Sequence, residues 1–243
     1  MSGKRNINIT EFILILTLFS IAMGFMESAV VVYLRRIYYP DGFNFPLQPI
    51  DGPIALTEIL REVATMIMLI TIAMLTGRTK TERFGFFIFA FGIWDIFYYV
   101  FLYILLGWPQ SLFTWDILFL IPTTWVGPVL GPVINSLSMI ALALLISKFT
   151  NHNRQVHIKS NEWILLISGS LVVIISYVED YIGYLRGNFT FWEIFHPGRV
   201  DELMEYALDY IPVDFSWWIF IVGQLMITAG IVLFYRRNSV RVK

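Results

Sequence analysis

The chain has 243 residues, of which 57% are hydrophobic, 17% aromatic and only 14% charged, and its mean hydropathy is +0.69. A soluble domain carries about 25% charged residues, so this chain has too few to cover a water-facing surface. Apolar stretches of about 18 residues or more recur along it, which predicts transmembrane helices. This pattern excludes a soluble enzyme, a nucleic-acid-binding domain and a disordered protein. With no cysteine, a disulfide framework, an iron–sulfur cluster and thiol catalysis are also excluded.

Six transmembrane helices are predicted, over about 12–34, 54–77, 84–106, 128–149, 163–185 and 214–235. The stretch from Trp115 to Phe149 is too long for one span, because as a helix it would extend about 52 Å and a bilayer core measures about 30 Å. Pro122, Pro128 and Pro132 interrupt its first half. We therefore expect a short interfacial or re-entrant piece at 115–121, followed by a stretch interrupted by proline and glycine that leads into the fourth span.

The distribution of basic residues predicts how the chain lies in the membrane. With the N-terminus inside, twelve of the 17 Lys and Arg residues fall on the inner side: Lys4, Arg5, Arg78, Lys80, Arg83, Lys148, Arg154, Lys159, Arg236, Arg237, Arg241 and Lys243. The outer side holds Arg35, Arg36, Arg186 and Arg199, and Arg61 falls within a span. The positive-inside rule then predicts cytoplasmic N- and C-termini.

The first apolar run is too long for a signal peptide and lacks a small-residue cleavage site, so it is kept as a span.

The fold class is thus all-α: a polytopic helix bundle in the cell membrane, with residues 1–243 as a single transmembrane domain. Residues 186–213 form its longest outer loop. The lipid bilayer is its first expected partner. Trp and Tyr side chains of membrane proteins concentrate at the bilayer surface.

Six acidic residues lie inside the predicted spans: Glu27, Glu58, Glu62, Asp95, Glu179 and Asp180. At about 1.5 Å per helical residue they lie roughly 6 to 16 Å below the outer ends of their helices, with Asp95 the deepest. Asn135 and Gln224 fall in the same layer, so every span contributes a polar group to the outer half of the membrane. A carboxylate in lipid is costly unless it is paired, protonated or hydrated. This layer therefore predicts a functional cavity that faces the extracytoplasmic side.

Within this layer the only basic residue is Arg61, which lies beside the helix face shared by Glu58 and Glu62. One arginine against six acids predicts a protonated carboxyl or a bound cation. We expect the function to depend most on Glu27, Glu62, Asp95 and Glu179. Glu58 and Asp180 are shallow enough to reach interfacial water. The alternative, a structural ion-pair network around Arg61, stays open.

Aromatic side chains accompany the acids along the helices, among them Trp94, Trp125 and Tyr181. Carboxylates among aromatic rings suit an organic cation, a hydroxylated ligand or a carbocation, and core packing is the alternative for each ring. The residues expected to bind a substrate are Glu27, Glu58, Arg61, Glu62, Asp95, Tyr98, Tyr99, Asn135, Tyr177, Glu179, Asp180 and Gln224.

The spans contain no histidine and no mid-span lysine, which argues against haem ligation and a retinal Schiff base. No nucleotide-binding or flavin-type dinucleotide fingerprint occurs either. We therefore expect no organic cofactor. A hard divalent cation stays possible, with the carboxylates as its ligands.

Three functions fit this pattern. The first is binding or transport of an organic or inorganic cation, with or without coupling of that transport to protons. The second is a cofactorless membrane enzyme acting on a lipid or isoprenoid, in which Glu27, Glu62, Asp95 and Glu179 are the catalytic candidates for general acid and base. The third is an accessory subunit of a membrane complex. The expected partners are accordingly a small cationic or lipid-like ligand and a homo-oligomer or larger membrane complex, with no nucleic acid.

Overall fold

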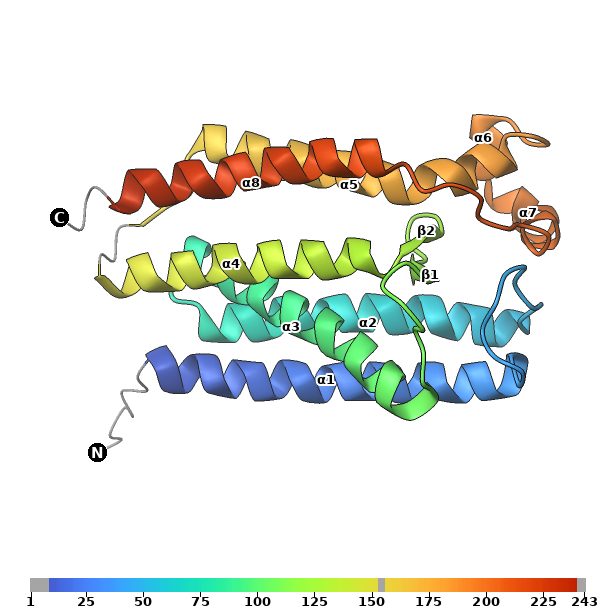
Figure 1. The fold of residues 1–243 in the computed structure, drawn as a ribbon, viewed down its shortest axis with the longest axis horizontal. Coiled ribbons are helices and arrows are strands. Elements are labelled where there is room, and N and C mark those ends of the chain that lie inside the picture. Colours follow the sequence, from blue (N-terminus) through green and yellow to red (C-terminus); the bar gives the residue numbers. More distant parts are fainter. Residues whose placement is uncertain (1–8, 153–155, 240–243) are drawn as a thin grey trace.

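The computed structural model describes residues 9–152 and 156–239, which form a bundle of long helices (Figure 1). The long helices are α1 (Ile9–Tyr38), α2 (Gly52–Thr76), α3 (Lys80–Leu106), α4 (Leu130–His152), α5 (Ser160–Leu185) and α8 (Trp217–Ser239). All six are long and apolar enough to cross a membrane. Each overlaps one predicted span, so the all-α fold and the number of spans are confirmed. The chain is a multi-pass membrane protein.

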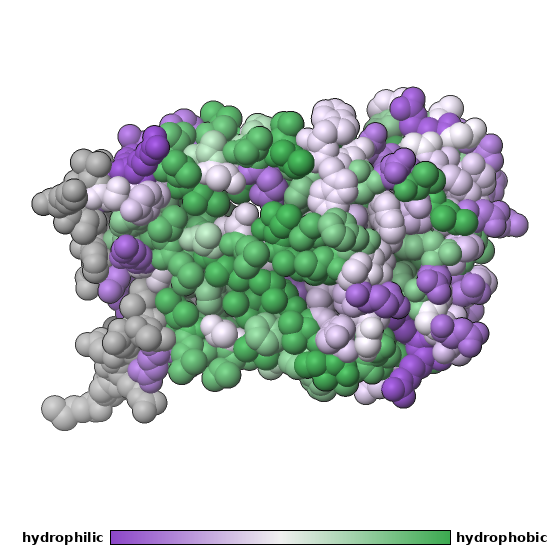
Figure 2. Space-filling model, viewed as in Figure 1, coloured by the Kyte–Doolittle hydropathy of each residue, from purple (hydrophilic) through white to green (hydrophobic). Residues whose placement is uncertain are grey.

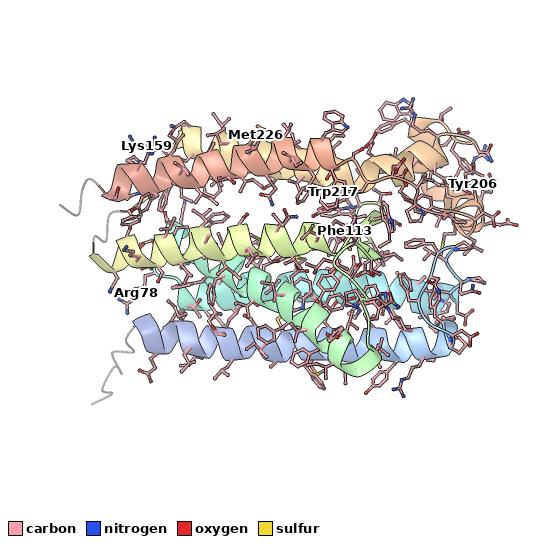
Figure 3. The ribbon with its side chains drawn as sticks, in the orientation of Figure 1. Arg78, Phe113, Lys159, Tyr206, Trp217 and Met226 are labelled. Carbon is pink, nitrogen blue, oxygen red and sulfur yellow. The ribbon has the colours of Figure 1, made fainter. Side chains whose placement is uncertain are left out.

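The two ends of the bundle differ in what they carry. The first described residues of α1 and the last described residues of α8 lie at the same end of the bundle, here called the termini end (Figure 1). The opposite end, here called the hairpin end, carries β1 (Trp115–Phe119), β2 (Trp125–Pro128), α6 (Phe191–Ile194), η1 (Pro197–Arg199) and α7 (Val200–Ala207). Figure 2 shows an apolar band between two more polar ends, as expected for a lipid-facing surface. In Figure 3, Arg78 and Lys159 lie at the termini end and Tyr206 at the hairpin end.

Glycines allow the closest helix contacts in the bundle. A Cβ atom on Gly223 of α8 would lie 2.8 Å from the backbone oxygen of Gly169 in α5 and 2.7 Å from Cγ2 of Val173. A Cβ atom on Gly92 of α3 would lie 2.8 Å from the backbone oxygen of Ser136 in α4. Small residues let two membrane helices approach closely enough for their backbones to touch. These glycines therefore set the α5–α8 and α3–α4 distances.

Replacing Gly223 with leucine is expected to lower the free energy of unfolding by about 1–3 kcal/mol, because the new side chain must push α5 and α8 apart. The melting temperature, followed by tryptophan fluorescence in detergent, measures this loss. Gly183→Leu is the matched control, because a Cβ atom at Gly183 meets nothing within 4 Å. Equal melting temperatures for both variants would contradict the close α5–α8 contact.

The segment that precedes the fourth span is an antiparallel β-hairpin. Trp115 of β1 lies opposite Pro128 of β2, and Ile117 lies opposite Val126. The sequence predicted an interfacial or re-entrant piece at 115–121 and an irregular stretch after it, but not that the two would pair as strands. Pairing gives hydrogen-bond partners to backbone N–H and C=O groups that no helix satisfies. The hairpin packs against α5 and α4 through β2.

An apolar core fills the half of the bundle nearest the termini end. Its most buried members include Leu16, Leu69, Ala90, Ile146 and Phe234, each no more than 2% exposed. They come from five of the six long helices. The hairpin half contains the intramembrane acids, so the two halves differ in chemistry.

Candidate functional site

A small cavity lies between α1, α2, α3 and β1, and is here called the acidic cavity. Its volume is about 50 Å³, which is room for only a few water-sized groups. Six of the residues predicted from the sequence line it: Glu27, Arg61, Glu62, Asp95, Tyr98 and Tyr99. The remaining lining residues are Thr65, Trp94, Ile117, Leu118 and Phe119. Three helices and the hairpin thus converge on one site.

The approach of α1 to α3 positions Glu27 at this site. A Cβ atom on Gly24 would lie 3.0 Å from the backbone oxygen of Trp94, so only glycine fits there without a shift. One turn along α1, the Ser28 hydroxyl donates a hydrogen bond to the backbone oxygen of Tyr98 at 3.0 Å. These contacts fix the neighbouring residue, Glu27, against α2.

Arg61 joins two carboxylates from different helices. Its Nε and Nη2 donate to Oε2 of Glu58 at 3.0 and 2.7 Å, and its Nη1 forms an ion pair with Glu27. The Thr65 hydroxyl donates to the other oxygen of Glu27 at 3.2 Å. One guanidinium therefore serves two acids, while Glu58 itself lies just outside the residues that line the cavity.

Glu62 holds the connection between the two strands. The backbone N–H of Leu120 donates to both carboxylate oxygens of Glu62, at 3.1 and 3.0 Å. Glu62 is ten residues into α2, which corresponds to about 15 Å along the helix. It is buried, with 7% of its surface exposed. The hairpin thus reaches deep enough between the helices to close over the acidic cavity.

Asp95, which the sequence predicts to be the deepest acid, comes from α3. Its Oδ2 accepts a hydrogen bond from the Ser136 hydroxyl of α4 at 2.7 Å. Among the described residues, no cation lies within ion-pair distance of Asp95 or Glu62. Within the same described part of the chain, the indole N–H of the cavity residue Trp94 has no hydrogen-bond partner. The cavity therefore presents two carboxyls without a basic partner and one free donor.

Glu179 and Asp180 lie elsewhere, on the last turns of α5. Glu179 accepts a hydrogen bond from the hydroxyl of Ser216, and Oδ2 of Asp180 accepts one from the Tyr210 hydroxyl at 2.5 Å. Neither acid lines the acidic cavity. Both instead fasten the chain that leads from α7 to α8.

Asn135, Tyr177 and Gln224 form a separate network between α4, α5 and α8. Asn135 Nδ2 donates to the Tyr177 hydroxyl at 2.7 Å, and Gln224 Nε2 donates to Asn135 Oδ1 at 2.6 Å. Polar side chains that bond across helices hold them together in lipid. These three residues lie outside the acidic cavity and join the α5–α8 pair to α4.

A buried ion pair that the sequence did not predict lies beside the cavity. Nη2 of Arg35 donates to Oδ1 of Asp116 at 3.0 Å, and the hydroxyl of the cavity residue Tyr99 donates to Oδ2 at 3.2 Å. The guanidinium carbon of Arg35 lies 4.3 and 3.6 Å from the ring centroids of Phe43 and Trp108. Burial raises the pKa of the Asp116 carboxyl to about 6, and the guanidinium and the phenol limit that rise. An arginine on the side that the positive-inside rule predicts to be the outer one is the signal that could have indicated such a pair.

Among the residues that the structure describes, no group of three or more His, Cys, Asp or Glu side chains is arranged to hold a metal ion. The geometry of the acidic cavity instead resembles a polar pocket in which carboxyls, phenols and one guanidinium face each other. In comparisons with known proteins, no family model, curated protein or solved structure matches the chain.

Proposed function

We propose that the acidic cavity binds a small monovalent cation in exchange with protons. The observation that carries this proposal is the charge of the groups that line it: Glu27, Glu62 and Asp95 face a single guanidinium. When all are ionised, two negative charges are in excess. Excess charge in a low-dielectric site is strongly unfavourable. A cation beside the carboxyls would offset part of this charge, and a proton on one of them would do the same in its place.

The size and lining of the cavity limit the cation. About 50 Å³ accommodates a sodium ion with a few water molecules, or a methylammonium ion. The rings of Trp94, Tyr98 and Tyr99 line the same space. Aromatic faces attract cations through their quadrupole, so a small ammonium ion suits the site better than a large organic one.

The proposed orientation places the hairpin end outside and both termini in the cytoplasm of a cell-membrane protein. Support comes from the basic residues at the termini end: Arg78, Lys80, Arg83, Lys148, Lys159, Arg236 and Arg237. Lys4, Arg5, Arg154, Arg241 and Lys243, which also favour this orientation, lie outside the described residues. The cation would then enter from the extracytoplasmic side, past the hairpin.

Glu62→Gln and Asp95→Asn are each expected to weaken cation binding by about tenfold or more, because each removes one charge a few ångströms from the ligand. Isothermal titration calorimetry of purified protein in nanodiscs at pH 8, with sodium chloride and with methylammonium chloride, measures the affinity. Binding should also release protons and weaken as the pH falls, because protons compete for the carboxyls.

Glu205→Gln is the matched control, because Glu205 is an exposed acid of α7. It should leave the affinity unchanged. The proposal would be contradicted if the wild-type protein bound neither cation, or if both cavity variants bound the cation as tightly as the wild-type protein.

A second function, acid–base catalysis on a lipid or isoprenoid, is favoured by the apolar core below the cavity. Leu69, Ala90 and Ile146 belong to that core and are buried in the half nearest the termini end. A transport path would need polar groups there, whereas an enzyme entered from one side would not. One protonated carboxyl would act as the general acid and an ionised one as the base. Turnover of a lipid extract by purified protein, lost in Asp95→Asn, would show this function.

A further inference from the structure

A second, larger cavity of about 610 Å³ opens at the hairpin end, between the last turns of α1, the loop that follows it and the end of α3. It is here called the headgroup cavity, and the residues that matter in it are Arg35, Arg36, Tyr39, Asp41, Phe43 and Trp108. We propose that it binds a phosphoethanolamine group, a phosphate joined to an ammonium, supplied by the lipid phosphatidylethanolamine.

The position of the cavity along the bundle indicates a lipid. The 30 residues of α1 extend about 45 Å, whereas the hydrocarbon core of a bilayer is about 30 Å thick. The last turns of α1, with Arg35 and Arg36, therefore reach the layer of lipid headgroups. Large apolar side chains nearby, Ile37 and Ile104, are each 67% exposed. Acyl chains can lie along that surface while their headgroup occupies the cavity.

Two opposite charges face the cavity without neutralising each other. Arg36 and Asp41 are both exposed residues that line it. Neither forms an ion pair among the described residues, so the two are farther apart than ion-pair distance. A zwitterion satisfies both, with its phosphate on the guanidinium and its ammonium on the carboxylate. An anionic headgroup would leave Asp41 facing a like charge.

Arg35 supplies a second donor for the phosphate. It lines the cavity, is more than nine-tenths buried, and is held by Asp116 through Nη2 alone. In the described part of the chain its Nη1 has no hydrogen-bond partner. A buried N–H group without an acceptor is unfavourable, and a phosphate oxygen would satisfy it. Stacking on Trp108 and Phe43 holds this guanidinium in place.

The test is to reconstitute the full chain into nanodiscs of equal parts phosphatidylethanolamine, phosphatidylcholine and phosphatidylglycerol, and to count the retained lipids by native mass spectrometry. Phosphatidylethanolamine should be enriched about tenfold over phosphatidylglycerol. Arg36→Gln and Asp41→Asn should each abolish the enrichment. Arg186→Gln, which removes an exposed arginine at the same end, should retain it.

Equal retention of phosphatidylglycerol and phosphatidylethanolamine would overturn the proposal. Enrichment of phosphatidylethanolamine that survives both variants would overturn it as well. A doubly exchanged variant, Arg36→Glu with Asp41→Lys, keeps both charges and should recover enrichment if the single variants lose it through charge rather than misfolding. Soluble phosphoethanolamine at millimolar concentration is the second arm. It should not displace the lipid, and displacement would mean that a free molecule rather than a membrane lipid is the ligand.

Discussion

Asp116→Leu is expected to lower the free energy of unfolding by about 3–5 kcal/mol, the usual cost of removing one partner from a buried ion pair. The partner of Asp116 is Arg35. The side chain of Arg35 is 8% exposed and that of Asp116 is 2% exposed, so water cannot replace the lost acceptor. Arg35 cannot lose its charge to relieve the penalty. The loss is measured by steric trapping in bicelles, or by unfolding in SDS.

Two further variants separate the charge from the shape of the side chain. Asp116→Asn keeps an oxygen acceptor for Arg35 and should cost much less than leucine. The double variant Arg35→Met with Asp116→Leu replaces the pair by apolar groups and should recover most of the stability. If the double variant were as unstable as Asp116→Leu, packing of the hairpin and not an unpaired charge would explain the loss.

The pH dependence of stability gives an independent test of this carboxyl. The pKa of Asp116 is raised from 3.8 to about 6, so between these values the folded chain holds a proton that the unfolded chain has lost. Stability contributed by this group is therefore fully present below pH 3.8 and falls as the pH rises through about 6. Asp116→Asn should remove this fall in stability. The difference in the free energy of unfolding between the wild-type protein and the variant, measured as a function of pH, reports it.

The positions of the acids along their helices could be predicted from the sequence, but the sides of the helices that meet could not. Helical rise fixes how far Glu27, Glu62 and Asp95 lie from the ends of their helices. Glu179 has a similar depth, yet it lies on α5, which pairs with α8 rather than with α1 or α2. Which helices are neighbours depends on close contacts such as the one between Gly169 and Gly223. No pattern within a single helix specifies that partner.

The hairpin could be predicted only as an irregular segment. Prolines and glycines between Trp115 and Pro132 indicate that no continuous helix forms. Strand pairing depends instead on what surrounds the segment, because backbone groups among apolar helices must find partners in each other. The carboxylate of Glu62, which accepts the Leu120 N–H, supplies one such partner from a distant part of the chain. The same dependence on distant partners explains why the Arg35–Asp116 pair was missed.

Arg61→Gln is expected to change stability and cation binding in opposite directions. The substitution leaves Glu27 and Glu58 without their shared guanidinium, each with a side chain only 12% exposed. At pH 8 the free energy of unfolding should fall by about 3 kcal/mol. The triple variant that also carries Glu27→Gln and Glu58→Gln should recover most of this loss, because no carboxylate is then left unpaired.

Cation affinity in Arg61→Gln should rise by about tenfold at pH 8, because the positive charge that competes with the ligand is gone. The added cation should also restore part of the lost melting temperature, since a ligand that binds only the folded chain stabilises it. Calorimetry and thermal melting on the same nanodisc samples measure both effects. A purely structural ion-pair network predicts the loss of stability without any gain in affinity, so the sign of the affinity change decides between that network and a cation site.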